Sequence, residues 1–204
     1  MEQDFFVTEI KKLAKGKYEV SLEGGEPLIL YGKELSAYSI REQSVLPGPV
    51  YEQIIREVLS RRATRRAMHL LEKMDRTEAD LREKLRKNGY PQRCIDAAIE
   101  YVTGYHYLDD QRYAQNYILF YQSKYSRRIL TQKLLQKGVD RQTIEECMDE
   151  IHTSDERAMI VKLLKKRGYD PEHADIKEKQ KTYAFLMRKG FSSSEISAAM
   201  KQEW

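Results

Sequence analysis

Helix-breaking residues are scarce in this 204-residue chain, which holds ten glycines and five prolines. That scarcity favours long helices over a turn-rich all-β fold. No uncharged apolar run approaches the roughly 18 residues that a membrane span requires, so we expect no membrane association. The first residues, MEQDFFVTEIKK, lack the basic-then-apolar order of a secretory signal, and we therefore expect a cytoplasmic protein.

Clusters of metal-binding or catalytic residues are also missing. The two cysteines, Cys94 and Cys147, are far apart in the sequence without a CxxC pair, and the four histidines are scattered singly. The sequence contains no GxxxxGK[ST], GxSxG, HExxH or GxGxxG motif. We expect a protein that is not an enzyme and that binds no metal or other cofactor.

Positive charge is scarce at the N-terminus and in excess after it. Residues 1–60 hold seven Lys or Arg against ten Asp or Glu, whereas residues 61–204 hold 29 against 22. A polyanionic partner would account for this excess, and so would a solvated helical surface.

The first 48 residues have a β-favouring composition. VTEI (7–10), KYEVSL (17–22) and PLILY (27–31) are short β-prone runs separated by glycine-containing turns. A small antiparallel sheet of two or three strands is expected, then a short helix at 33–38 and a longer helix opened by Pro47-Gly48-Pro49. So small a sheet is marginal alone, and we expect it to pack on the helices that follow.

After residue 60 the apolar spacing is helical, and three stretches align on a glycine. A leucine lies four residues before each glycine, an apolar residue follows it, and an isoleucine lies six residues after it. The glycine is typical of a left-handed helix stop, and the residue two positions later (Pro91, Asp140 or Ser192) is typical of a helix start. The stretches are LREKLRKNGYPQRCIDAAI (81–99), LTQKLLQKGVDRQTIEECM (130–148) and TYAFLMRKGFSSSEISAAM (182–200).

A further helix precedes each stretch, at 63–74, 110–124 and 155–167, and Thr77 and Ser126 are expected to cap the middle helices. The predicted fold is therefore mainly α: an elongated tandem array of three three-helix repeats, preceded by a small N-terminal antiparallel β region. We divide the chain into an N-terminal extension with a linker helix at 1–58 and repeats at 59–109, 110–153 and 154–204.

Two features of the repeats invite a catalytic or stacking role. Asp109 and Asp110 resemble a carboxylate pair, but neighbours at a helix start point apart, and we interpret them as a cap that complements the helix dipole. Tyr113, Tyr117, Tyr121 and Tyr125 recur every four residues, and we favour packing over stacking on bases. Of the four, Tyr125 is expected to face a partner.

The cysteines occupy two different columns of the repeat. Cys147 aligns with Ala98 and Ala199, which predicts a small core site. Cys94 aligns with Thr143 and Glu195, so a more exposed position is expected for it.

Basic residues recur at comparable places in the repeats and are candidates for phosphate contacts without base reading. SRRATRR places four arginines on one side of a helix, and SRRILTQKLLQKG carries a second patch. The candidate binding residues are Arg61, Arg62, Arg65, Arg66, Arg82, Arg86, Lys87, Lys124, Tyr125, Arg127, Arg128, Lys133, Lys137, Arg188 and Lys189.

Three segments together resemble the RecX family of bacterial regulators of the RecA recombinase. They are RTEADLREKLRKNGY (76–90), GYHYLDDQRYAQNYI (104–118) and SRRILTQKLLQKGV (126–139). The resemblance covers about residues 60–202, and the N-terminus resembles the extension of Firmicute-type members. The third repeat departs from the pattern, because PEHADIKEKQKTYAFLMRKG gives it a longer and more polar middle helix.

The resemblance implies a monomeric regulator that binds the RecA–DNA filament, contacts single- and double-stranded DNA, and modulates ATP hydrolysis, strand exchange and co-protease activity, usually by inhibition. Two alternatives stay open. One is a sequence-nonspecific nucleic-acid-binding helical module that is not specific to RecA. The other is a metal-dependent nuclease that uses the Asp109–Asp110 pair.

Overall fold

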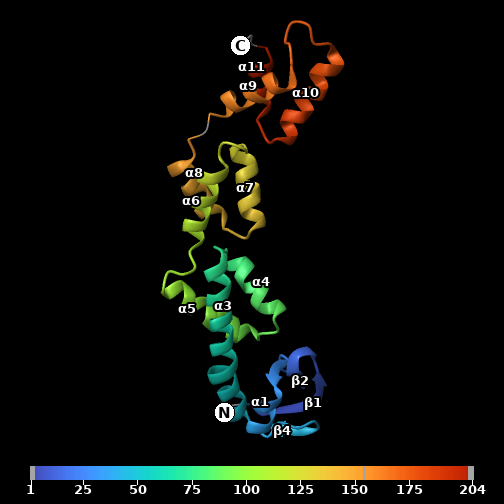
Figure 1. Ribbon diagram of the computed structural model, residues 1–204, viewed down its shortest axis with the longest axis vertical. Helices are drawn as coiled ribbons and strands as arrows, with labels where there is room; N and C mark the ends of the chain where they lie inside the picture. The colour runs from blue at the N-terminus through green and yellow to red at the C-terminus, as the bar shows by residue number, and fades with distance from the viewer. Residues whose placement is uncertain (1–2, 154, 202–204) are drawn as a thin grey trace. The chain divides into compact units, whose positions relative to one another are not determined.

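The computed structural model describes residues 3–153 and 155–201. The chain divides into two compact units, Met1–Asp109 and Asp110–Trp204, which are described here one at a time (Figure 1). Within the described residues, no helix combines the length and the apolar character that a membrane span needs.

The first unit begins with a four-stranded antiparallel sheet of order β3-β2-β1-β4. The strands are β1 (Phe5–Lys12), β2 (Lys17–Leu22), β3 (Leu28–Tyr31) and β4 (Ser44–Leu46). The three predicted strands are confirmed. The fourth was missed because it is only three residues long and is defined by its pairing with the start of β1, where Val45 lies opposite Phe6.

One short helix lies between β3 and β4, and a long helical segment follows β4. The predicted short helix is α1 (Gly32–Ala37). From Gly48 the backbone is helical without a break through α2 (Gly48–Gln53), a π-helical stretch η2 (Ile54–Ser60) and α3 (Arg61–Lys73), since Ile54 and Arg61 at the joints keep helical dihedrals. The linker helix and the first repeat helix, which the sequence suggested as separate, are therefore one segment (Figure 1).

The sheet packs on this helical segment, as expected. Val7, Val20 and Leu30 of the sheet share one buried cluster with Ile54 and Leu59 of η2. Burying an aliphatic side chain of this size contributes about 1.5–3 kcal/mol, so the common core stabilises a sheet that would be marginal alone.

Arg62 fastens the sheet to α3. Its guanidinium forms an ion pair with Glu34 of α1, donates to the carbonyl of Ile29 at 3.0 Å and lies 4.7 Å from the centre of the Tyr31 ring. Arg62 and Glu34 each keep only 23 % side-chain exposure, which makes this pair less screened than an ordinary surface ion pair.

Three tandem three-helix repeats make up the rest of the chain, which confirms the mainly α fold with a small N-terminal sheet. The helices are α3, α4 (Glu78–Lys87) and α5 (Gln92–Gly104) in the first repeat; α6 (Asp110–Tyr121), α7 (Arg127–Gln136) and α8 (Arg141–Ile151) in the second; and α9 (Glu156–Arg167), α10 (Ile176–Arg188) and α11 (Ser193–Met200) in the third.

The predicted helix signals account for these boundaries. Thr77 and Ser126 accept hydrogen bonds from the backbone N–H three residues on, and Ser192 forms a capping box with Glu195. Gly89, Gly138 and Gly190 have φ values of +80°, +85° and +89°. The local chemistry of caps and left-handed stops thus sets where each helix begins and ends.

Gly190 is required for space as well as for its dihedral angle. A Cβ atom there would lie 2.5 Å from both Ser126 Oγ and Ile129 Cγ1. The Ser126 hydroxyl also donates to the Lys189 carbonyl at 3.0 Å. The helix stop of the third repeat therefore packs against the first turn of α7.

Each of the last two repeats has its own core. Ala114, Ile118, Leu134 and Ile144 belong to one cluster, against which the three tyrosines of α6 and Tyr125 just after it pack while partly buried. Ile160, Leu164, Leu186 and Phe191 belong to the other. The packing interpretation of the tyrosine stripe is confirmed.

The two cysteines are both buried. Cys147 matches its prediction, whereas the expectation that Cys94 would be more exposed is wrong. The Cys94 thiol donates to the Ile55 carbonyl of η2 at 3.8 Å. The π-helical stretch η2 packs on the face of α5 that carries Cys94, whereas the aligned Thr143 and Glu195 are partly exposed. Burial raises the pKa of the Cys94 thiol.

Candidate nucleic-acid interface

The four arginines of α3 are not equivalent in the structure. Arg61 and Arg65 are exposed, whereas Arg62 and Arg66 are half-buried. Neighbours on a helix differ by about 100° in direction, so the i and i+4 members face solvent while the other two turn toward the protein. Of the four arginines, two therefore remain on the outer face of α3.

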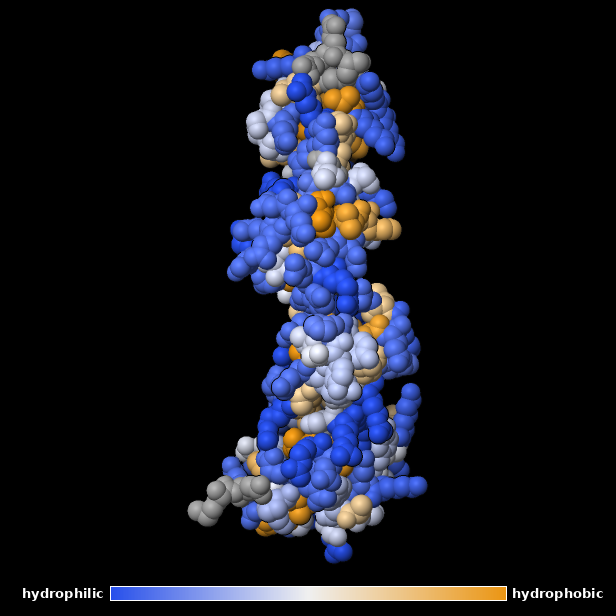
Figure 2. Space-filling model, turned by 90° about the vertical axis from the view of Figure 1, so that its left-hand side faces the viewer, coloured by the Kyte–Doolittle hydropathy of each residue, from blue (hydrophilic) through white to orange (hydrophobic). Residues whose placement is uncertain are grey.

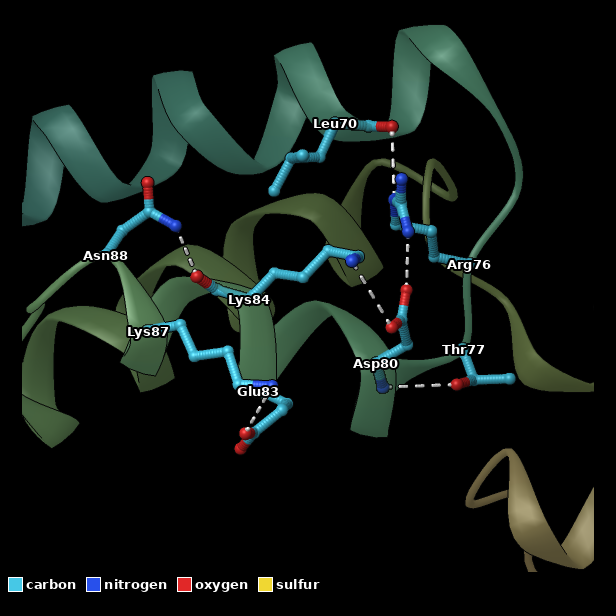
Figure 3. Close-up of polar contacts among 8 residues, drawn as sticks. All are labelled: Leu70, Arg76, Thr77, Asp80, Glu83, Lys84, Lys87 and Asn88. Carbon is cyan, nitrogen blue, oxygen red and sulfur yellow. Dashed lines mark hydrogen bonds and ion pairs between the residues drawn. The ribbon is translucent and has the colours of Figure 1, made fainter.

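The cations of α4 lie among acidic side chains (Figure 3). Arg82 pairs with Glu78 at 2.7 Å and with Asp96 of α5 at 2.5 Å. Arg86 and Lys87 share Glu83, at 2.6 Å and 3.3 Å. Lys84 and Arg76 both contact Asp80.

These contacts act on the acids as well. Hydrogen bonds from Lys87 and Arg86 hold the pKa of Glu83 below its usual range, and a hydrogen bond from Arg82 does the same to the pKa of Asp96. The acids therefore stay ionised near neutral pH and offset the positive potential of α4, although exposed pairs of this kind contribute little stability.

The second repeat presents a different arrangement, which we call the lysine–tyrosine row. It consists of Tyr113, Tyr117, Tyr121 and Tyr125 together with Lys124, Lys133 and Lys137. Along α6 and into the turn that follows it, the ring centres of Tyr113 and Tyr117 lie 6.3 Å apart, those of Tyr117 and Tyr121 4.6 Å, and those of Tyr121 and Tyr125 5.6 Å. Burial, and then the neighbouring tyrosines, raise the pKa of Tyr117, so its hydroxyl stays protonated.

Lysine ammonium groups lie over these rings. Lys137 Nζ is 5.7 Å from the ring centres of both Tyr113 and Tyr117, and Lys133 Nζ is 4.9 Å from that of Tyr125. Lys124 Nζ is 5.5 Å from the Tyr121 ring and 4.8 Å from the ring of Phe120. Lys137 at the C-terminal end of α7 thus lies over tyrosines of α6, and Lys133 of α7 lies over Tyr125 in the turn between the two helices.

The row has two chemical consequences. Contacts of this length between an ammonium group and a ring favour a defined position of the lysine side chain. Such a side chain loses less conformational entropy on binding a phosphate than a fully solvated lysine would. Lysine groups also cover ring faces that bases would need for stacking. The arrangement suits phosphate oxygens better than bases.

The neighbouring arginines divide between structure and surface. Arg127 pairs with Asp149 at 2.5 Å and donates to the carbonyl of Met148 at 3.4 Å, both near the C-terminal end of α8, where a cation complements the helix dipole. Arg128, Lys124 and Lys133 are exposed or lie on rings, and none of the described carboxylates forms an ion pair with them.

The third repeat has a smaller version of this arrangement. Arg188 and Lys189 are exposed, and Lys189 Nζ lies 5.7 Å from the Phe185 ring. Arg167 lies 5.1 Å from the same ring. Arg167 was not among the predicted binding residues, although the basic run KLLKKRG at the end of α9 carried the signal.

Asp109 and Asp110 lie at the start of a helix. α6 begins at Asp110, in agreement with the helix-start interpretation. Across residues 3–153 and 155–201, no group of three or more His, Cys, Asp or Glu side chains is placed to hold a metal ion. Exposed tyrosines at 101, 105 and 107, which contact one another, were not anticipated.

Family profiles match all three repeats. Profiles described as the first, second and third three-helix domains of RecX match residues 63–101, 109–148 and 155–200. Together they cover more than half of the chain.

Relatives of similar length carry the same description. A protein named Regulatory protein RecX from Caldanaerobacter subterraneus subsp. tengcongensis is 25% identical over 192 residues, which cover 94% of this chain and 95% of the relative. A protein of the same name from Clostridium perfringens is 30% identical over 156 residues, covering 74% and 73%.

Solved structures share the fold. One described as a crystal structure of regulatory protein RecX has a TM-score of 0.65 at 23% identity and covers 97% of this chain and all of that one. RecX from Lactobacillus salivarius has a TM-score of 0.61 at 21% identity, with 70% and 94% coverage. From its three matched domains and its relatives along most of its length, this chain belongs to the RecX family of regulatory proteins.

Proposed function

We propose that this protein binds the RecA–DNA filament and inhibits its ATP hydrolysis, strand exchange and co-protease activity by occupancy rather than by catalysis. Family membership supports a regulatory role, and the resemblance to regulators of RecA supplies the partner. The observation that carries the DNA contact is the lysine–tyrosine row of the second repeat.

The row has a suitable length for a nucleic-acid backbone. From Tyr113 to Tyr121 the helix α6 rises about 12 Å, and the turn after it carries Tyr125, while phosphates repeat every 3.4 Å or so along each strand of a duplex. Ammonium groups along such a row face several phosphates, and binding releases their condensed counterions. Contacts of this kind position a protein on single- or double-stranded DNA without reading bases.

The repeats, taken as 59–109, 110–153 and 154–204, divide the work unequally in this proposal. On α4 the cations Arg82, Arg86 and Lys87 lie beside acids, which oppose phosphate binding. In the second and third repeats, Lys124, Lys133, Lys137 and Lys189 lie over aromatic rings. We therefore assign the main DNA contacts to residues after Asp110, with Arg61 and Arg65 as secondary contacts, in a cytoplasmic, monomeric protein.

One alternative is favoured by the same observation. A row of ammonium groups would also bind naked DNA, so the protein could be a nucleic-acid-binding module without specificity for RecA. That module would bind a RecA-coated strand no better than a bare strand.

A competition experiment separates the two functions. Fluorescently labelled single-stranded DNA, bare or coated with the cognate RecA and a non-hydrolysed ATP analogue, is titrated with the full chain at several salt concentrations. Tighter binding to the coated strand supports the proposal. Equal or weaker binding, with a steep salt dependence on bare DNA, would leave the alternative in its place.

A further inference from the structure

The outward face of α6 carries two large apolar side chains that no core uses. Leu119 is 55% exposed and Phe120 is 65% exposed. Asn116, one turn earlier on α6, and Ser123, just after the helix ends, are exposed and uncharged. Figure 2 shows orange and tan side chains gathered at the surface about midway along the chain, among blue ones.

The Phe120 ring is held in place although it is exposed. Its centre lies 4.7 Å from that of Tyr121 in an edge-to-face arrangement, and Lys124 Nζ lies 4.8 Å from it. An aromatic side chain that is already ordered loses less conformational entropy on binding, which is typical of interface anchors.

The third repeat provides an internal comparison. α6 begins at Asp110 and α9 at Glu156, and each buries the fifth and ninth residues of its helix, Ala114 and Ile118 in one case and Ile160 and Leu164 in the other. The next two positions are Leu119 and Phe120 in α6 but Lys165 and Lys166 in α9. The fold itself therefore accepts charged residues there, and packing does not explain the apolar pair.

We propose that Leu119 and Phe120 are a docking anchor for a protein partner that presents an apolar side chain beside a carboxylate. The carboxylate would pair with Lys124 at the edge of the anchor while the apolar side chain covers the Phe120 ring. This inference rests on the proposed function, and the partner surface would then belong to a protein subunit of the filament.

Charge decides against the other occupants. A two-fold contact between copies of this chain centred on Phe120 would bring the Lys124 of each copy into one interface, and two like charges there are unfavourable. A nucleic acid gains little from Leu119, which offers no ring for stacking. An acidic and apolar protein surface complements both parts of the anchor.

The test uses the full chain with Leu119→Gln and Phe120→Gln together. Glutamine is a good helix former without charge, so we expect an unchanged helical circular-dichroism spectrum and melting temperature. Affinity for the RecA-coated strand should fall by about tenfold or more, as on loss of an interface anchor. Affinity for bare single-stranded DNA should stay within about twofold, since Lys124 keeps its charge and its contact with the Tyr121 ring.

The matched control is Ile176→Gln on α10. Ile176 is 77% exposed, so the control removes a similar exposed apolar surface from another repeat, and its binding should equal that of the wild type. If the double variant lowers the melting temperature, the single change Phe120→Gln replaces it in the same assay.

Each other outcome is decisive. Absence of filament binding by the wild type overturns the proposed function and this inference with it. Equal filament binding by wild type and variant overturns the anchor alone. A parallel loss on bare DNA would assign the face to nucleic acid, and a wild-type dimer that the variant breaks, seen by sedimentation, would assign it to a second copy; both results overturn the inference.

Discussion

At the scale of single residues, glycines that end helices differ in what surrounds them. Gly190→Ala forces an L-residue into φ of +89° and places its Cβ against Ser126 and Ile129, whereas Gly168 has φ of +69° with open space around it. Left-handed strain costs about 1–2 kcal/mol, and overpacking adds about 1–3 kcal/mol. Gly190→Ala should therefore lower the free energy of unfolding more than Gly168→Ala.

Urea denaturation followed by circular dichroism measures this difference. Both positions belong to the third repeat, so the same transition reports both changes. Equal destabilisation by the two substitutions would contradict the close contact at Gly190.

Arg62 is a second residue with a specific expected effect. Arg62→Ala removes a half-buried ion pair with Glu34 and a hydrogen bond to Ile29, and should lower the free energy of unfolding of the first unit by about 1–3 kcal/mol. Arg65→Ala, on the exposed face of the same helix, should change it by about 0.5 kcal/mol or less. Thermal denaturation compares the two; similar melting temperatures would contradict the fastening role of Arg62.

The contact partners of single residues could not be predicted from the sequence. A basic residue is visible in the sequence, but Arg82 meets Asp96 only because α5 folds back beside α4, and Arg62 meets Glu34 only because the sheet docks on α3. The error at Cys94 has the same origin, since the column comparison assumed three equal repeats while η2 covers one of them.

At the scale of elements, the boundaries of helices were predictable because their signals are local. Thr77, Ser126 and Ser192 cap helices through bonds to residues three positions away, and the glycine columns mark the stops. β4 lacks such a signal, because three residues become a strand only through pairing with β1. Only part of the lysine–tyrosine row could be predicted from the sequence, namely the four-residue spacing of the tyrosines. The placement of Lys133 and Lys137 over tyrosine rings depends on how α7 packs on α6.

The row predicts a specific salt dependence. Lys124→Gln, Lys133→Gln and Lys137→Gln together remove three of the proposed phosphate contacts, so the slope of log affinity against log salt on duplex DNA should become shallower by about 2.7. The matched variant Arg82→Gln, Arg86→Gln and Lys87→Gln removes three cations that lie beside acids and should change the slope by less than one. Fluorescence anisotropy at four salt concentrations gives both slopes; equal changes would contradict the unequal division between repeats.

At the scale of the whole molecule, three repeats of similar fold carry different surfaces. The first is fastened to a sheet and has paired cations on α4, the second presents the lysine–tyrosine row and an exposed apolar pair, and the third has a smaller basic cluster around Phe185. A repeated core with varied faces would let one fold contact DNA and protein at once, as the proposed regulation by occupancy requires.

The most direct test of this account is the DNA-dependent ATPase rate of the cognate RecA filament with the full chain added at stoichiometric amounts. The account predicts a lower rate with the wild type and with the Arg82, Arg86 and Lys87 variant, and a rate near that of RecA alone with the Lys124, Lys133 and Lys137 variant. An unchanged ATPase rate in the presence of the wild type would contradict it.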